Sequence, residues 1–370
     1  MQKKFISLLL ICFILLLSSC SASQNTTQSS TQSTSGAAET TATTTSEPQI
    51  PTSSFIVDNS SSRGLYYLDY TEDYKFDKFI SGGGAKSTLE LVEYAYKAFP
   101  NIKLNLSSLG YGCSSFCTQS IEGDVIFGRN FDMDTKNSGS YLIVHTTPEN
   151  GYESYSTVNL KFLGITTPQE PTDDTSPLLL APYIPLDGIN SEGLAICVLQ
   201  LNFPEIHASG SGVNMTSTTI IRNVLDNAKN IEEAIEIFQS CNVHTDGYAY
   251  HYMLGDASGN SAVIEFVNGE MVVSYKSSDI QVCANTYITE EGIAFYQDSD
   301  SADSIKRMNA ISSSITAVNF DLTTENAFKA LQAGSNSYTR WSIVYNLTDK
   351  TMSVSINKKF NKTYFYSFEK

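Results

Sequence analysis

Histidine is scarce in this chain, with four copies among 370 residues. None of the four lies in a metal-binding or protease motif, and we interpret His251 as a structural residue of a strand. A papain-type protease needs a histidine beside its thiol, and zinc hydrolases need clustered ligands. Both classes are therefore disfavoured, and we expect neither a metal nor another cofactor.

Basic side chains are also few: 23 Lys and Arg stand against 39 Asp and Glu, which leaves a net charge of −16. Such an acidic chain is repelled by phosphate backbones, so nucleic acid is not an expected partner. No basic patch follows the N-terminal segment, so charge alone would not hold the protein on a membrane. No internal repeat is visible either.

The seven cysteines do not make a disulfide framework. Cys12 and Cys20 lie in the N-terminal segment, and an odd number remains, so at least one free thiol is expected. A local disulfide or half of a metal site at Cys113 and Cys117 is an alternative, but no second ligand pair of suitable spacing follows. The remaining cysteines are predicted to be buried small side chains: Cys197, Cys241 and Cys283.

The first residues resemble a bacterial lipoprotein signal. Two lysines precede an apolar run over Phe5–Leu17 that is too short for a permanent membrane span, and small residues lead to Cys20. We therefore predict a signal peptide over residues 1–20 and an exported lipoprotein, anchored through Cys20 on the extracytoplasmic side of a membrane. An ordinary signal peptide cut near Ser19 or Ala22 is the alternative.

The rest of the chain divides into three parts. Residues 21–53 are almost entirely Ser, Thr, Gln and Ala and are predicted to be a disordered tether. Residues 54–112 form a partly helical pre-segment, with helical apolar spacing over Leu89–Phe99. Residues 113–370 form the main domain, of α+β class.

In the main domain, strand signals are separated by two pairs of helices, which predicts two antiparallel sheets covered by helices. Asn230 is placed as a helix N-cap, and Asn268-Gly269 predicts a tight hairpin. Predicted strands cover 116–120, 125–131, 141–146, 194–201, 250–254, 262–267, 271–275, 282–286, 338–345 and 352–356, and predicted helices cover 218–228, 231–238, 304–315 and 324–331.

A thiol, a guanidinium and a carboxylate occur within twenty residues, at Cys113, Arg129 and Asp132. Glycine reaches backbone angles closed to other residues, so a strained bond after Gly112 would be a suitable point of self-cleavage. The freed α-amine of Cys113 titrates near pH 8 and could act as general base for its own thiol. Arg129 beside the thiol would lower its pKa.

This pattern resembles the choloylglycine hydrolases, which include bile-salt hydrolases, penicillin V acylases and the related penicillin acyltransferases. In that family an arginine follows the nucleophilic cysteine by sixteen residues, and an aspartate follows it by nineteen within a Phe-Gly-Arg-Asn-x-Asp motif. The same count excludes Cys117. The resemblance implies a four-layer αββα N-terminal nucleophile hydrolase fold and cleavage between Gly112 and Cys113.

Later stretches extend the resemblance. Leu201-Asn202-Phe203-Pro204 and Ala284-Asn285-Thr286 resemble segments that supply oxyanion-hole donors, which implies this role for Asn202 and Asn285. The family also has a late active-site arginine; Arg307 is the better placed candidate, and Arg340 is the alternative. Asp132 would orient the α-ammonium.

The resulting hypothesis is a cysteine-nucleophile amidase that hydrolyses linear N-acyl amides through a thioester. An acyltransferase that passes the acyl group to an amine is one alternative, and a non-catalytic lipoprotein that binds ligands with this fold is another. The partner is a small-molecule N-acyl amide; bile salts, penicillin V and N-acyl amines all remain open. The sequence does not predict an oligomeric state.

Overall fold

The computed structural model describes residues 53–58, 63–104, 111–134, 139–165, 175–208, 210–296 and 301–368. All described residues belong to one compact unit, residues 47–370. The predicted signal peptide, Cys20 and residues 21–52 of the predicted tether lie outside the described residues. Within the described ranges, no helix is long and apolar enough to cross a membrane.

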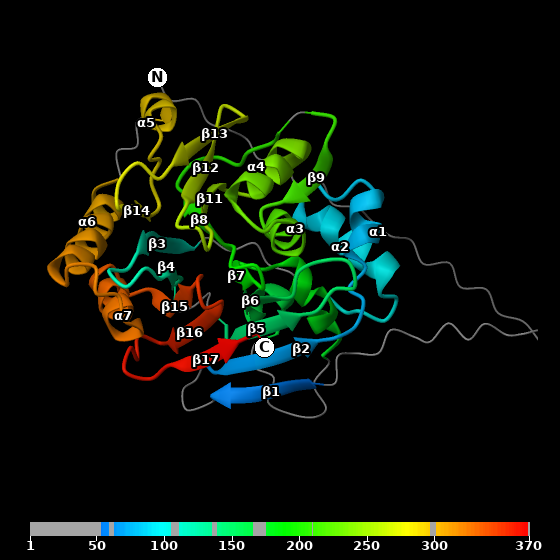
Figure 1. Cartoon of the computed structure of the whole chain (residues 1–370). Helices are drawn as coiled ribbons and strands as arrows, with labels where there is room; N and C mark the ends of the chain where they lie inside the picture. The colour runs from blue at the N-terminus through cyan, green and yellow to red at the C-terminus, as the bar shows by residue number, and fades with distance from the viewer. Residues whose placement is uncertain are drawn as a thin grey trace, which may run out of the picture. The chain divides into compact units, whose positions relative to one another are not determined.

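Two large sheets form the centre of this unit (Figure 1). The first has nine strands, in the order β1 (Ser53–Asp58), β2 (Leu65–Tyr70), β5 (Tyr141–Thr146), β6 (Ser154–Asn159), β7 (Asp187–Asn190), β8 (Ala195–Leu201), β11 (Ala249–Gly255), β12 (Ser261–Val267) and β13 (Glu270–Tyr275). The second has six, in the order β14 (Ile280–Cys283), β3 (Gly112–Gln119), β4 (Val125–Asp132), β15 (Thr339–Asn346), β16 (Thr351–Ile356) and β17 (Tyr364–Ser367). A small parallel pair joins β9 (Val213–Thr216) and β10 (Cys241–His244).

Helices cover the outer face of each sheet. Helix α3 packs on β7 and β8 of the first sheet, and α6 and α7 pack on β3, β4, β14 and β15 of the second. The predicted α+β class with helix, sheet, sheet and helix layers is therefore confirmed. The helices are α1 (Phe76–Ser81), α2 (Thr88–Ala98), α3 (Thr219–Asn227), α4 (Ile231–Ser240), α5 (Glu290–Tyr296), α6 (Ser301–Ala317) and α7 (Thr324–Ala333), with 3-10 turns at Leu160–Leu163 and Ser176–Tyr183.

Strand alternation divides the buried side chains of the six-stranded sheet between two cores. Cys113, Cys117 and Phe131 belong to the core that includes the side chains of the nine-stranded sheet. Phe116 and Val344 instead face the helices, and the second core is completed by Ile126, Ile311, Ile315, Leu322, Ala327, Phe328, Ala330 and Leu331. Cys113 therefore faces the layer between the two sheets.

The pre-segment is part of the nine-stranded sheet. Strand β2 pairs antiparallel with β1 and parallel with β5, and β1 begins at Ser53, the last residue of the predicted tether. Helix α2 begins after Ser87, whose side chain accepts a hydrogen bond from the Glu90 amide. The amphipathic helix predicted over 89–99 is thus confirmed within one residue at each end.

Local turn and cap signals were good predictors. The Asn230 side chain caps α4, and Asn268 and Gly269 both have positive φ, 52° and 83°, as a tight hairpin turn requires. The strand predicted over 282–286 is wrong in its second half. Strand β14 ends at Cys283, and Asn285 beyond its end contacts the Cys113 amide through its side chain.

Candidate active site

The β3–β4 hairpin explains the spacing of the predicted nucleophile and its partners. Gly112 pairs directly with Asp132, and Cys113 pairs with Phe131. Arg129 lies two residues from Phe131 on the same face, so it is the diagonal neighbour of Cys113. Arg129 and Asp132 follow Cys113 by sixteen and nineteen residues in the sequence. The hairpin brings both of them next to Cys113 on the neighbouring strand.

Arg129 contacts the Cys113 thiol and is held rigidly. Its Nη2 lies 3.2 Å from Cys113 Sγ, while its Nη1 donates to the carbonyls of Leu186 and Val198 at 2.9 and 3.0 Å. Its Nε lies 2.7 Å from Asp187 Oδ2, and both side chains are fully buried. The guanidinium therefore presents a fixed positive charge to the thiol in a site without solvent access.

Arg129 lowers the pKa of the Cys113 thiol, as predicted, but it does not determine the net shift in the uncut chain. Burial raises the pKa of Cys113 to about 12, and this effect exceeds the opposing effect of Arg129. The carboxylate of Asp132 raises it further. The thiol is thus neutral at physiological pH, because desolvation of a thiolate costs more here than one buried cation recovers.

This burial predicts slow alkylation of Cys113 in uncut chains. With a pKa of about 12 in the fold and an ordinary value of 9.0, the thiolate fraction at pH 8 should be about a thousandfold lower than in the unfolded chain. Labelling by iodoacetamide should slow by that factor and accelerate roughly tenfold per pH unit between pH 8 and 11. The labelling rate is measured by peptide mass mapping. Only preparations whose intact mass shows an uncut chain are used. Half-buried Cys241 is the internal control, and Cys113 labelling as fast as Cys241 would contradict the prediction.

Gly112 does not have the predicted unusual backbone angles. It lies in strand β3 and is not among the described residues with positive φ. Space explains the glycine instead: a Cβ at this position would lie 3.3 Å from Asp132 Cβ and 3.4 Å from Asn285 Oδ1. Close packing against these two residues, and not backbone strain, distinguishes the Gly112–Cys113 bond.

Asp132 lies at the end of β4 among hydrogen-bond donors. Its Oδ1 accepts from Thr339 Oγ1 at 2.7 Å, and its Oδ2 accepts from Asn336 Nδ2 at 2.9 Å and lies 3.4 Å from Arg307 Nη1. Burial raises the pKa of Asp132, although Arg307, Thr339 and Asn336 all oppose that effect. The carboxylate is therefore already oriented, opposite Gly112, before any new N-terminus exists.

Asn285 and Arg307 hold the backbone of Cys113. Asn285 Oδ1 accepts from the Cys113 amide at 2.8 Å, and Arg307 Nη1 donates to the Cys113 carbonyl at 2.6 Å. Arg307 Nη2 also donates to Asn285 Oδ1 at 2.9 Å, so two donors define the orientation of that side-chain amide. The alternative, Arg340, instead donates to the Met133 carbonyl. Asn285 thus contacts the nitrogen of the Gly112–Cys113 bond, which differs from the predicted contact with an oxyanion.

A hollow of about 470 Å³ lies beside the Gly112–Cys113 bond. Asn202 lines this hollow and is exposed to solvent. It takes no part in the contacts that Asn285 and Arg307 make with the backbone of Cys113. The other lining residues come from several elements and include Tyr111, Gly112, Asp132, Gln200, Tyr248, Asn285, Asp303, Ser304, Arg307, Asn336 and Tyr338. Four of the six predicted site residues surround a fifth, Cys113, and Asn202 lines the hollow that leads to them.

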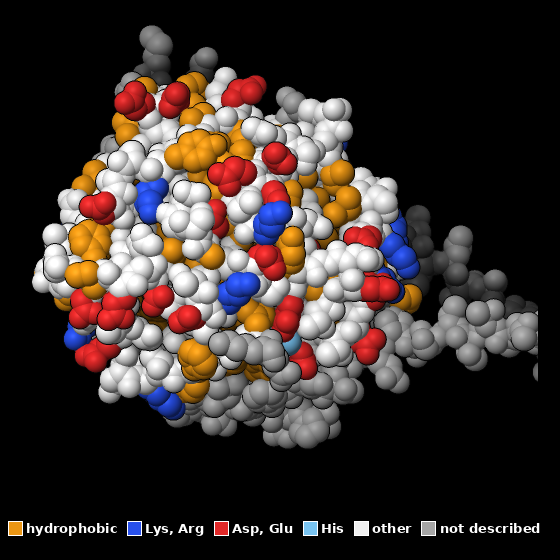
Figure 2. Space-filling view, in the orientation of Figure 1, with side chains coloured by type: hydrophobic (Ala, Val, Ile, Leu, Met, Phe, Trp, Pro, Cys, Tyr) orange, Lys and Arg blue, Asp and Glu red, His pale blue; other side chains and the backbone are white. Residues whose placement is uncertain are grey.

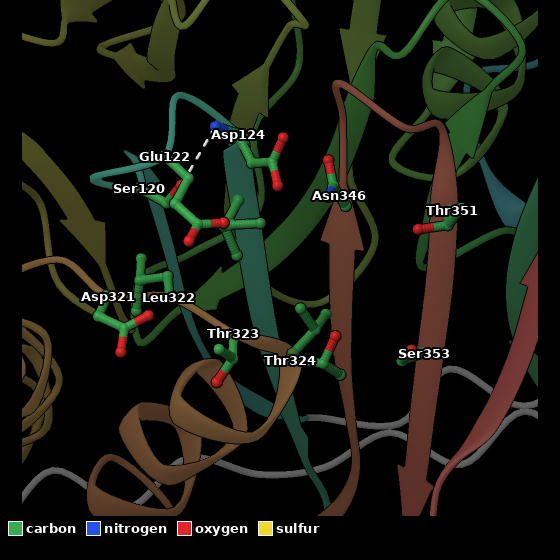
Figure 3. Close-up of a pocket in the computed structure, with 12 residues that line it drawn as sticks. Ser120, Glu122, Asp124, Asp321, Leu322, Thr323, Thr324, Asn346, Thr351 and Ser353 are labelled. Atoms are coloured by element: carbon green, nitrogen blue, oxygen red, sulfur yellow. Dashed lines mark hydrogen bonds between the residues drawn. The ribbon is translucent and has the colours of Figure 1, made fainter.

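A second hollow, of about 180 Å³, lies at the opposite end of β4 (Figure 3). It is formed by the turn after β3 and the start of α7, and the Asp124 amide donates to Ser120 Oγ within it. Glu122 and Asp321 add acidic groups. Across the described ranges, no three acidic, histidine or cysteine side chains are close enough to hold a metal ion. The lining of this hollow contains neither a cysteine nor an arginine, unlike the surroundings of Cys113.

Several site residues were not predicted from the sequence. Gln200 accepts from the Tyr111 amide at 2.6 Å, and Asp187 pairs with Arg129. Asn336 and Thr339 hold Asp132 from more than 200 positions away in the sequence. All of these contacts join segments that are far apart in the sequence, so no local signal predicted them.

Residues 182–368, half of the chain, match the profile of the acyl-coenzyme A:6-aminopenicillanic acid acyl-transferase family. The chain belongs to this family. The matched region contains Asn202, Asn285 and Arg307 and begins after Cys113. Membership in the penicillin acyltransferase family therefore rests on the second half of the domain, while the hairpin with the thiol is supported by its own geometry.

One curated relative of this acyltransferase-family chain is a penicillin V acylase. It comes from Pectobacterium atrosepticum and is 30% identical over 112 residues, which is 27% of this chain and 30% of that protein. The chain thus spans less than a third of this curated relative.

Two solved structures resemble the fold. A penicillin V acylase from Agrobacterium tumefaciens has a TM-score of 0.50 and 18% identity, over 69% of this chain and 86% of that one. A conjugated bile acid hydrolase from Clostridium perfringens has a TM-score of 0.48 and 15% identity, over 69% and 92%. The first likeness confirms the predicted N-terminal nucleophile hydrolase fold.

Proposed function

We propose that this protein is a cysteine-nucleophile amidase that acts on linear N-acyl amides after cutting its own chain between Gly112 and Cys113. In the first step the Cys113 thiol attacks the Gly112 carbonyl carbon, the carbon–nitrogen bond breaks, and the leaving nitrogen takes the thiol proton. Water then hydrolyses the thioester, which yields a carboxylate on Gly112 and a free N-terminal Cys113.

One observation supports this proposal: three polar groups of Cys113 are each contacted by a predicted site residue. Arg129 contacts the thiol, Asn285 accepts a hydrogen bond from the amide, and Arg307 donates one to the carbonyl. A buried structural cysteine needs none of these three polar contacts. Asn285 accepts from the nitrogen that must leave, and Arg307 fixes the strand on the other side of the thiol. Fixed positions of reacting groups are a large part of what an enzyme contributes to rate.

Cleavage would change the electrostatics of the thiol. The new α-ammonium of Cys113 would lie beside Asp132, whose carboxylate already faces Gly112. A second positive charge beside Arg129 and the exposure of the site to the hollow both favour a thiolate. The uncut thiol is thus neutral and protected, and the cut one is activated.

The same thioester chemistry supports hydrolysis or acyl transfer. A substrate amide loses its amine to form an acyl-Cys113 thioester, and water or a second amine then takes the acyl group. The named relatives are acylases, which favours hydrolysis, whereas the family that matches residues 182–368 is named for acyl transfer. A lipoprotein that only binds ligands remains the third candidate.

We also propose that the protein is exported and lipidated on Cys20, with the domain held near a membrane by residues 21–53. The sequence supports this through the lysines, the short apolar run and the small residues before Cys20. Acidic side chains are spread over the face in Figure 2 with basic ones scattered between them, which offers no basic surface on that face. Attachment would therefore depend on the lipid.

The test of the function is an intact-mass measurement combined with an activity panel. We expect purified wild-type protein to give two fragments that meet at Gly112 and Cys113, and to release amines from N-acyl amides such as penicillin V, glycine-conjugated bile salts and N-acylethanolamines. Each substrate is run with and without an acceptor amine, which separates hydrolysis from transfer. A continuous chain that hydrolyses amides would exclude the self-cleavage step, and a continuous, inactive chain would favour the binding protein.

The pre-segment is expected to remain bound after cleavage. Strand β2 forms a ladder with β5, and Tyr74 Oη donates to Asp226 Oδ2 at 2.8 Å in a buried contact. Phe79 packs edge-on against Tyr183 with ring centroids 5.5 Å apart. Both fragments should co-elute in size-exclusion chromatography and separate only in denaturant, with the uncut Cys113→Ala chain as reference. A C-terminal fragment that elutes alone would contradict this integration.

A further inference from the structure

The loop that carries Asn285 is held from the opposite sheet by two buried side chains. His251 on β11 and Glu265 on β12 are both fully buried, and the ring nitrogen Nδ1 lies 3.1 Å from Glu265 Oε1. The other ring nitrogen, Nε2, lies 2.7 Å from the carbonyl oxygen of Ala284, the residue before Asn285. Together these contacts connect the nine-stranded sheet to a loop that starts on the six-stranded one.

Glu265 holds the far end of the same loop. Its Oε1 accepts from the Ile288 amide at 2.8 Å, and its Oε2 accepts from the amide of Thr289 at 3.1 Å and from the Thr289 hydroxyl. Asn285 therefore lies between two fixed points, Ala284 and Ile288. The loop has little freedom to move Asn285 away from the Cys113 amide.

Both nitrogens of the His251 ring lie beside oxygen atoms. A neutral imidazole has one N–H donor, yet both ring nitrogens of His251 face oxygen acceptors, so satisfying both contacts needs two N–H groups. Burial raises the pKa of Glu265, but the bonds from His251, Thr289 and Ile288 together hold it below its ordinary value. Among the described residues, the Cys283 thiol is the other titratable group in contact with the ring, 3.5 Å from Nε2, and burial raises its pKa well above its usual range.

We propose that His251, held as an imidazolium between Glu265 and the Ala284 carbonyl, is a positioning residue that places Asn285 against the Cys113 amide. The proposal rests on the proposed self-cleavage and deepens it. His251 touches no reacting atom; it acts through the backbone of Ala284. The interpretation of His251 as a purely structural residue is thereby replaced by a role in the geometry of the site.

Two substitutions separate the two contacts of the ring. The amide of His251→Gln places a donor near the former Nε2 and can keep the bond to Ala284, whereas the amide of His251→Asn places one near Nδ1 and can keep only the bond to Glu265. Both remove the charge and the ring. Positioning predicts that cleavage slows about threefold in His251→Gln and ten- to a hundredfold in His251→Asn. His244→Asn, a buried histidine on β10 outside the site, should cleave like wild type.

The experiment measures cleavage rates by intact mass, unfolding free energies of each variant, and the ¹⁵N spectrum of histidine-labelled protein. We expect two protonated ring nitrogens for His251 at pH 7, assigned by the signal missing in His251→Asn. Equal rate losses in the Gln and Asn variants that follow their stability losses would overturn the proposal, as would one unprotonated ring nitrogen. If wild-type chains stay uncut, the self-cleavage hypothesis is wrong whatever the His251 variants show. The ¹⁵N spectrum then still tests whether both ring nitrogens of His251 are protonated.

Discussion

A Cys113→Ala chain should remain one continuous polypeptide and lose amidase activity by about 10⁴-fold or more, the scale on which removal of a nucleophile acts in enzymes. The substitution removes the attacking sulfur from both the self-cleavage step and the substrate reaction. Intact mass and amine release, measured on the same preparation, report the two losses together. The fold should survive, since Cys113 contributes one buried small side chain to a large core.

Cys117 provides a closely matched control for this experiment. It lies on the same strand and the same face, is equally buried, and has a pKa that burial also raises to about 12. Cys117→Ala should therefore match Cys113→Ala in its effect on stability while it cleaves and hydrolyses at the wild-type rate. If Cys117→Ala is the uncut and inactive chain, or if Cys113→Ala still cuts, the nucleophile is assigned to the wrong residue.

Replacement of Arg129 by leucine should affect stability and chemistry together. It leaves the Asp187 carboxylate buried without its cation, and breaking a buried pair in this way costs about 3–5 kcal/mol of unfolding free energy. The thiol also loses the positive charge of Arg129, which lowers its pKa, so cleavage should fall below detection. Urea unfolding measures the first effect, and intact mass measures the second.

Two further variants separate charge pairing from catalysis. Arg222→Leu breaks another buried pair, in which Arg222 Nη2 lies 2.6 Å from Asp226 Oδ1, so it should destabilise comparably but still cleave. The double variant of Arg129→Leu with Asp187→Leu should recover much of the stability, because no uncompensated charge remains, and should stay uncut. Wild-type cleavage by either variant that lacks Arg129 would exclude Arg129 from the reaction.

The sequence by itself determined the relation between Cys113, Arg129 and Asp132. These residues lie on one hairpin, and a short turn converts a fixed number of residues into a fixed register across two strands. The same local logic predicted the Asn230 cap, the Asn268-Gly269 turn and most strand positions. In each case the determining interactions lie within a few residues or one hairpin.

Tertiary structure alone decided what surrounds that hairpin. The position of Arg307 against the Cys113 carbonyl, and of Arg340 elsewhere, depends on how α6 and β15 pack on β3 and β4. The contact of Asn285 with the Cys113 amide depends on a loop held by the other sheet. The raised pKa of Cys113 follows from burial between two sheets, and burial is a property of the packed layers that no spacing in the sequence encodes.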